Sequence, residues 1–166
     1  MSFVALGEIT VTGTKTSITF SSISQAYRDL YMVITQVGVN GTGGRPVIKV
    51  NNDSNYANYF GQALRTNGTS FLSANSINNQ DYGATLALTV NNGGGNDVFY
   101  DIWFMDYSAT DKHKNILNHA NSGSYGNEML VNRWANTTAI TSLVLYFPSG
   151  LPFGTGTTVT LYGVTA

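Results

Sequence analysis

Residues 141–166 read TSLVLYFPSGLPFGTGTTVTLYGVTA, and this stretch is the clearest signal of the fold class. Two apolar runs, LVLYF and TTVTLYGV, flank a turn that is rich in proline and glycine. In the second run, Val159 and Leu161 alternate with threonine and tyrosine residues. Because successive side chains of a β-strand point to opposite faces, the alternation predicts a strand whose Val159 and Leu161 side chains face the core.

Similar short runs, rich in β-branched and aromatic residues, recur along the chain. They are EITVT (8–12), SITF (17–20), DLYMVITQV (29–37), PVIKV (46–50), TLALTV (85–90), VFYDIWFMDY (98–107) and AITSLVLYF (139–147). The run at 29–37 is long enough for a strand that is buried on both faces. Residues that favour tight turns separate the runs, at 40–41, 43–44, 67–68, 93–95 and 148–150. This arrangement is typical of an all-β sandwich or barrel.

Helical signals are weak. The segments SISQAYRDL (22–30) and NYANYFGQAL (55–64) each predict at most one helical turn, near 24–28 and within 55–64. No linker, charge block or fixed-period repeat divides the chain, so we expect a single domain over residues 1–166.

The composition excludes several classes of function. Only 10% of the 166 residues are charged, the formal net charge is −1, and no basic cluster occurs. The counterion release that drives nucleic-acid binding is therefore missing, and no apolar run approaches the about 20 residues of a membrane helix. The chain has no cysteine, which excludes disulfides and thiolate metal sites. The start, MSFVALGEITVTGT, lacks the pattern of a signal peptide, so we expect synthesis in the cytoplasm.

The low charge also bears on assembly. Edge strands are usually protected by lysine, proline or bulges, and the chain has only 8 Lys and Arg residues to distribute. Pairing with partner subunits in a closed oligomer would solve the same problem, so we expect a homo-oligomer, with a trimer as the expected form.

Candidate catalytic and metal-binding residues are few. His113 and His119 lie in DYSATDKHKNILNHANSG with two aspartates, and on one strand their spacing would place both imidazoles on the same face. No third ligand is evident, which favours a polar connection followed by a half-exposed strand. The stretch NNDSNY (51–56) lacks the spacing of a calcium loop, which favours a turn. We expect no metal, no cofactor and no enzymatic activity.

Several tyrosines are candidates for contact with a partner or a glycan. They are Tyr59, Tyr82, Tyr125 and Tyr162. Tyr125 lies in GSYGNE, which is typical of a loop tip, and Tyr162 lies on the outward side of its predicted strand. Trp134, just before a predicted strand, is instead expected in the core, because large aromatic residues commonly close the end of a sandwich.

Three stretches carry a family resemblance. They are AYRDLYMVITQV with RPVIKVNNDSNYANY, then DIWFMDYSATDKHKNIL, then NRWANTTAITSLVLYFPSGLPFGTGTTVTLYGV. Together they resemble small virion proteins of tailed phages of jelly-roll type. The matched positions are Tyr27, Asp29, Leu30, Asn51, Asp53, Tyr107, Lys112, Trp134, Ala139, Ile140, Thr141, Phe153, Gly156, Thr157, Leu161, Tyr162 and Gly163. The resemblance implies an antiparallel β-sandwich of jelly-roll type.

The resemblance also implies a setting in a virion. Such domains occur as capsid decorations and as parts of fibres or tail appendages. A bare domain without a shaft favours a decoration (cement) protein that binds the major capsid protein or another virion protein. Two alternatives remain open: a receptor-binding fibre or tail head that contacts host glycans, and a free-standing carbohydrate-binding module.

Overall fold

The computed structural model describes residues 1–37, 44–66, 71–78, 83–87, 97–122 and 126–165, with the backbone alone for 71–78. Within these ranges the chain forms twelve strands and one 3-10 turn, η1 (Tyr56–Asn58). The larger sheet contains β1 (Phe3–Thr10), β3 (Asp29–Gln36), β5 (Tyr59–Thr66), β6 (Phe71–Asn78), β8 (Val98–Met105), β9 (Lys114–Ser122), β10 (Gly126–Trp134) and β12 (Thr158–Val164). The smaller sheet contains β2 (Ser17–Phe20), β4 (Val47–Val50), β7 (Ala84–Thr85) and β11 (Leu143–Tyr146).

The strand order is that of a jelly roll. The large sheet runs β1-β12-β3-β8-β9-β10-β5-β6, the small sheet runs β2-β11-β4-β7, and each pairing of neighbours is antiparallel. The arrays β1-β12-β3-β8 and β2-β11-β4-β7 form the two layers, and the chain crosses between them from β1 to β2, β3 to β4, β7 to β8 and β11 to β12. The expected antiparallel jelly-roll sandwich is therefore confirmed.

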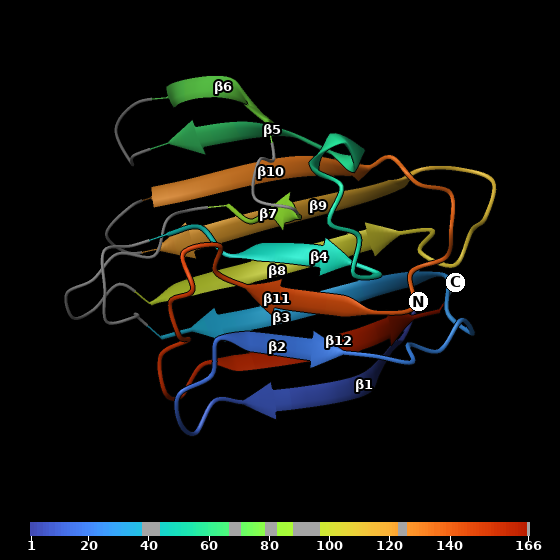
Figure 1. The fold of residues 1–166 in the computed structure, drawn as a ribbon, viewed down its shortest axis with the longest axis horizontal. Coiled ribbons are helices and arrows are strands. Elements are labelled where there is room, and N and C mark those ends of the chain that lie inside the picture. The colour runs from blue at the N-terminus through green and yellow to red at the C-terminus, as the bar shows by residue number, and fades with distance from the viewer. Residues whose placement is uncertain (38–43, 67–70, 79–82, 88–96, 123–125, 166) are drawn as a thin grey trace.

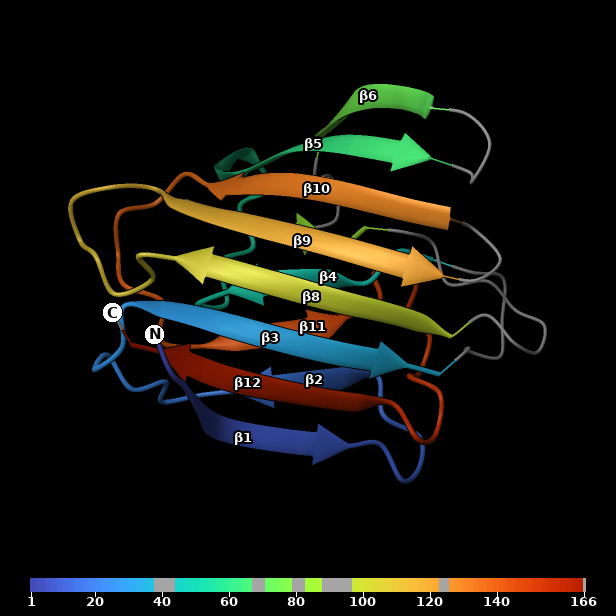
Figure 2. The same ribbon diagram turned by 180° about the vertical axis from the view of Figure 1, so that it is seen from behind.

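Two hairpins widen the large sheet. The hairpin β5–β6 comes between β4 and β7, and the hairpin β9–β10 comes between β8 and β11. Because β10 pairs with β5, both hairpins join the same edge of the four-stranded array. Figure 1 shows this extension reaching past the small sheet at β5 and β6. The large sheet thus presents a broad outer face, which points toward the viewer in Figure 2.

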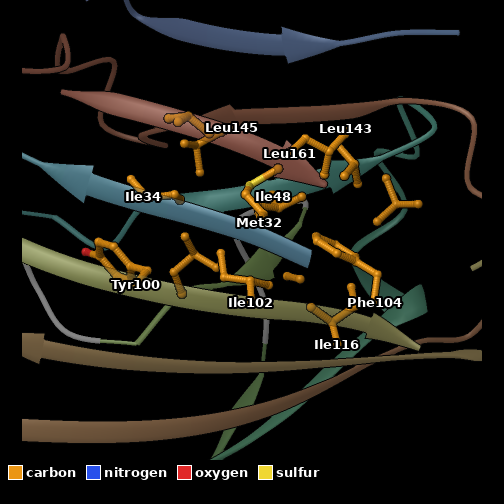
Figure 3. Packing of buried hydrophobic residues seen from close by; sticks show 14 of the residues in the cluster. Met32, Ile34, Ile48, Tyr100, Ile102, Phe104, Ile116, Leu143, Leu145 and Leu161 are labelled. Carbon is orange, nitrogen blue, oxygen red and sulfur yellow. The ribbon is translucent and has the colours of Figure 1, made fainter. Parts of the chain in front are cut away.

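The core lies between the two sheets. Met32 and Ile34 on β3 and Ile102 on β8 are buried against Ile48 and other apolar residues of the small sheet (Figure 3). Val159 and Leu161 are 0% and 1% exposed, so the predicted inward face of β12 is confirmed. Full burial of a leucine or isoleucine side chain contributes about 1.5–3 kcal/mol, so this cluster is the main source of stability.

The predicted runs coincide with strands of the structure, but some of the strands begin or end at other residues than predicted. The run at 8–12 belongs to a strand that begins at Phe3, the run at 85–90 contributes only Thr85 to β7, and residues 139–142 precede β11. The strand at 29–37 is buried on one face only, because Tyr31 and Val33 are half-buried and Thr35 is exposed. On that outer side the Phe3 ring packs against Tyr31, and no further sheet of the described residues lies over the strand.

The helical predictions fare differently. Residues 24–28 form no helix, whereas η1 supplies one tight turn, with Asn55 as its N-cap. The rest of the segment 55–64 is strand β5, so the prediction of at most one helical turn within it is confirmed. The turns predicted at 40–41, 67–68 and 93–95 lie outside the described residues.

Candidate interaction surface

Of the two tyrosines proposed for partner contact that lie within the described residues, Tyr162 is on an outward face and Tyr59 is not. Tyr162 is half-buried on the outer side of β12. Tyr59 is 2% exposed, and its hydroxyl donates to the Asp53 carbonyl and accepts from the Val50 amide, so its assignment as a contact residue is wrong. Burial raises the pKa of Tyr59, as expected for a phenol that closes a core. Tyr82 and Tyr125 lie outside the described residues.

The two histidines do not share a strand face. His113 is exposed and precedes β9, whereas His119 lies within β9 and its Nδ1 is 3.0 Å from the Asp101 carboxylate. Among the described residues, no group of three or more His, Cys, Asp or Glu side chains is placed to hold a metal ion. The pair of His119 and Asp101 instead forms a polar spot on the outer face of the large sheet.

The stretch 51–56 forms a hydrogen-bonded turn, as predicted. The Asn51 and Asn52 backbones adopt φ of 49° and 56°, a left-handed conformation that asparagine tolerates better than most residues. Asn51 Oδ1 accepts from the Thr141 and Ser142 amides at 2.8 and 3.1 Å, and its Nδ2 donates to the Ala139 carbonyl at 2.7 Å. This side chain therefore fastens the turn to the segment before β11.

Asp53 fastens the same turn to the end of β10. Its carboxylate accepts from the Asn55 amide at 2.9 Å, from Asn58 Nδ2 at 2.8 Å and from Trp134 Nε1 at 2.7 Å. Burial acts to raise the pKa of Asp53, but these hydrogen bonds outweigh it and hold the pKa below its ordinary value. Trp134 is 1% exposed, which confirms the prediction that it lies in the core.

Further matched residues gather at the same end of the sandwich. The Asp106 amide donates to Asp29 Oδ1 at 2.8 Å, and the Ile140 amide donates to the Tyr107 carbonyl at 2.8 Å. The ring of Tyr27 lies over Gly163, where a Cβ atom would come within 2.4 Å of the ring. We call the residues that hold this end together the polar clamp: Tyr27, Asp29, Asn51, Asp53, Tyr107, Trp134 and Gly163. Their interactions are structural, and all seven are positions that carry the phage resemblance.

The outer face of the large sheet has the opposite character. On β5, β8 and β10, six of its side chains are large, apolar and between 41% and 48% exposed. They are Phe60 and Leu64 on β5, Phe99 and Met105 on β8, and Met129 and Val131 on β10. We call these six residues the apolar patch.

Strand register connects the patch to its neighbours. Met129 pairs with Leu64 on one side and with His119 on the other. A second row crosses seven strands, through Ala5, Tyr162, Tyr31, Trp103, Leu117, Val131 and Gln62. The apolar patch is thus part of a sheet face on which apolar and aromatic side chains lie side by side across strands.

One corner of this face is aromatic. The Tyr31 ring centroid lies 4.8 Å from that of Trp103 and 6.2 Å from that of Tyr162, and Phe3 packs edge-on against all three rings. Burial, followed by the charge of Asp101, raises the pKa of Tyr31, so its hydroxyl stays protonated at neutral pH. We call these four rings the aromatic corner.

Charged groups on the face are already engaged within the chain. Asp101 faces His119, and the Arg133 guanidinium lies 4.6 Å from the ring centroid of Phe60. Glu8, toward the β1 edge, accepts a hydrogen bond from the Thr160 hydroxyl at 3.1 Å. Lysine is absent from the outward positions of β3, β5, β8, β9, β10 and β12, which are the described strands that build this face.

The inner side of the same strands carries the polar residues. Glu128 is 1% exposed and forms two 3.0 Å contacts with the Arg45 guanidinium. Asn118 accepts from the Ala87 amide at 2.7 Å, and Asn132 donates to the Thr85 carbonyl at 3.0 Å. These buried side chains hold the β7 segment against β9 and β10, and they leave the apolar residues of β10 on the outside.

Concave sites occur elsewhere on the chain. A shallow hollow of about 370 Å³ beside the small sheet is lined by Lys49, Tyr146 and Phe147 among others, and the Lys49 ammonium already lies over the Tyr146 ring. A cleft of about 160 Å³ lies between β1 and β2, lined by Leu6, Phe20, Leu161 and the serines at 21, 22 and 24. It contains no titratable side chain and no nucleophile with a base beside it. The outer face of the large sheet is therefore the strongest candidate for a functional surface.

Comparisons with known proteins add little. No protein-family model matches the chain, and no curated protein sequence matches it. A solved structure, the galectin LEC-6 of Caenorhabditis elegans, matches with 12% sequence identity and a TM-score of 0.34 over 96% of each chain. Similarity at this level supports no conclusion about ligand or function. Within the described ranges, no helix is long and apolar enough to cross a membrane.

Proposed function

We propose that the protein is a non-enzymatic virion structural protein, a capsid decoration protein that acts as a homo-oligomer with three copies as the expected number. The observation that carries the proposal is the apolar patch on the outer face of the large sheet. Leu64, Met129 and Val131 lie side by side in this patch, and exposed apolar side chains that adjoin one another in this way commonly mark contacts with other proteins. In this role the protein is made in the host cytoplasm and functions on the particle.

Two further observations support the proposal. The residues that carry the phage resemblance and form the polar clamp maintain the fold, as expected for a family defined by its scaffold. The charged groups of the outer face are few and already contact groups of their own chain, Asp101 with His119 and Arg133 with the Phe60 ring, so a contact there relies mainly on apolar and neutral hydrogen-bonded interactions. Assembly through this face should therefore persist at 1 M salt, where charges are screened beyond about 3 Å.

A receptor-binding head is the second candidate, and the aromatic corner favours it. The rings of Tyr31, Trp103 and Tyr162 lie beside the polar pair of Asp101 and His119, a combination of apolar rings and hydrogen-bonding groups that suits a sugar. In this case the corner, and not the apolar patch, would contact a host glycan.

Copy number on purified particles tests the two roles. Quantitative mass spectrometry, with the major capsid protein as internal standard, should find hundreds of copies per particle for a decoration protein. A few to tens of copies would assign the protein to an appendage, and its absence from particles would overturn both roles. Rebinding of the purified protein to particles stripped of it, at low and high salt, should then give equal occupancy.

A further inference from the structure

We infer that the apolar patch is the self-contact surface of the protein and that its occupant is a second copy of this chain. The inference deepens the proposed function, on which it rests, by naming the partner of this surface.

The size of the face suits a stable protein contact. From β12 to β5 the large sheet spans six strands. At about 4.8 Å per strand and about 3.4 Å per residue, six strands of six residues cover about 29 by 20 Å, or about 600 Å² of flat sheet. Protruding side chains make the accessible area larger, which brings it close to the about 800 Å² per partner of a standard interface.

The charge of the face suits a copy of itself. Asp101 and Arg133 are the charged residues beside the patch, and each is engaged within its own chain by His119 and by Phe60. Two such faces bring together equal numbers of Asp101 carboxylates and Arg133 guanidinium groups, so the contact buries no net charge from these residues. A strongly charged partner such as a nucleic acid finds no complementary charge there.

The shape of the face suits another sheet. Met129 and Val131 alternate along β10 with the buried Leu130, and Leu64 stands beside Met129 on β5. Two sheets that present such side chains pack about 10 Å apart, as the two layers of a sandwich do. The contact between two copies would thus repeat, between chains, the packing that forms the core within each chain. Because both copies use the same face, this contact joins two copies, and a trimer needs a second contact elsewhere on the chain.

Variants at the centre of the patch test the inference on the full chain. Met129→Glu and Val131→Glu each place a charge where the second copy would pack, and Thr19→Glu is the matched control. Thr19 is an exposed strand residue on the outer face of the small sheet. Native mass spectrometry and sedimentation velocity give the oligomeric state, and thermal melting confirms that each variant is folded.

The wild type and Thr19→Glu should form the same oligomer at micromolar concentration. Met129→Glu and Val131→Glu should be folded but weakened in self-association by at least about 30-fold, the effect typical of a residue at an interface centre. A wild type that stays monomeric, or patch variants that keep the oligomer, would overturn the inference.

Two further experiments test whether the apolar patch binds a lipid surface or the virus particle instead of a second copy. A monomeric wild type that binds vesicles of neutral phosphatidylcholine, with the binding lost in Val131→Glu, would assign the patch to a lipid surface and overturn the inference. A monomeric wild type that rebinds to stripped particles through the patch would overturn the inference but leave the proposed function intact. An oligomer that dissociates in the patch variants but never occurs on particles would support the inference and overturn the proposed function.

Discussion

The polar clamp and the apolar patch treat their side chains in opposite ways. In the clamp, Asp53 and Asn51 accept or donate several hydrogen bonds each, and Trp134 is buried with its indole N–H engaged. In the patch, Met129 and Val131 remain 44% and 47% exposed. The difference separates two kinds of sequence constraint: the clamp residues maintain the scaffold of one chain, whereas the patch residues are free to be selected for contact with another.

The largest expected effect on folding is at the centre of the clamp. Trp134→Ala should lower the free energy of unfolding by about 3–5 kcal/mol, because it removes a buried aromatic side chain and leaves Asp53 without one of its donors. Chemical denaturation followed by circular dichroism measures the loss.

A matched control separates the two contributions at this position. Trp134→Phe keeps most of the apolar volume but removes the N–H donor, so it should cost about 1–2 kcal/mol. If Trp134→Ala costs no more than the exposed change Val131→Ala, the contrast between clamp and patch is lost.

A smaller contrast lies within one strand. Leu161→Ala should cost about 2–5 kcal/mol, because the side chain is buried between the sheets. Thr160→Ala should cost about 0.5 kcal/mol or less, since its hydroxyl makes only an exposed bond to Glu8. Equal losses in urea melts of the two variants would show that the faces of β12 are assigned wrongly.

The smallest expected effect is a loss of the stability that the Asp53 carboxylate contributes to the polar clamp, and it occurs only at acid pH. Because the folded pKa of Asp53 lies below the ordinary 3.8, its contribution to stability is fully present above that pH and is lost as the pH falls through the folded pKa. The stability difference between the wild type and Asp53→Asn should therefore shrink as the pH is lowered from 5 toward 2. Urea melts across this range measure it, and a constant difference would argue that the carboxylate charge has no part in the clamp.

Much of the fold was predictable from the alternation of apolar and polar residues along the strands and from the residues that favour turns. The strands around SITF and VFYDIWFMDY, and the inward face of β12, follow from sequences in which buried apolar residues alternate with more exposed ones. Strands β5, β6 and β10 were not predicted. In β10 the usual pattern is inverted, because Glu128 and Asn132 are inside and Met129 and Val131 are outside.

The candidate surface was harder to predict for the same reason. Glu128 is accommodated inside only because Arg45, 83 residues away in the sequence, reaches it. Asn132 likewise depends on the carbonyl of Thr85. Such long-range partners leave no local signal, so MLV at 129–131 reads as an ordinary apolar run. Tyr162 was found because its strand follows the usual pattern, whereas Tyr59 was misassigned because a buried tyrosine with a bonded hydroxyl has the same local sequence as an exposed one.

The pairing of β1 with β12 brings residues that are far apart in the sequence into direct contact. The Ser2 amide lies 3.1 Å from the Thr165 hydroxyl across a separation of 163 residues, and Figure 1 shows the N and C labels close together. The jelly roll therefore depends on which strands are neighbours and not on where the chain is opened. A circular permutant that joins residues 2 and 165 by a short linker and starts anew in the exposed turn at Asp111 would keep each described strand pairing. It would also make β1 and β12 a local hairpin, so that a contact between residues 163 positions apart in the sequence becomes a contact between near neighbours in the sequence.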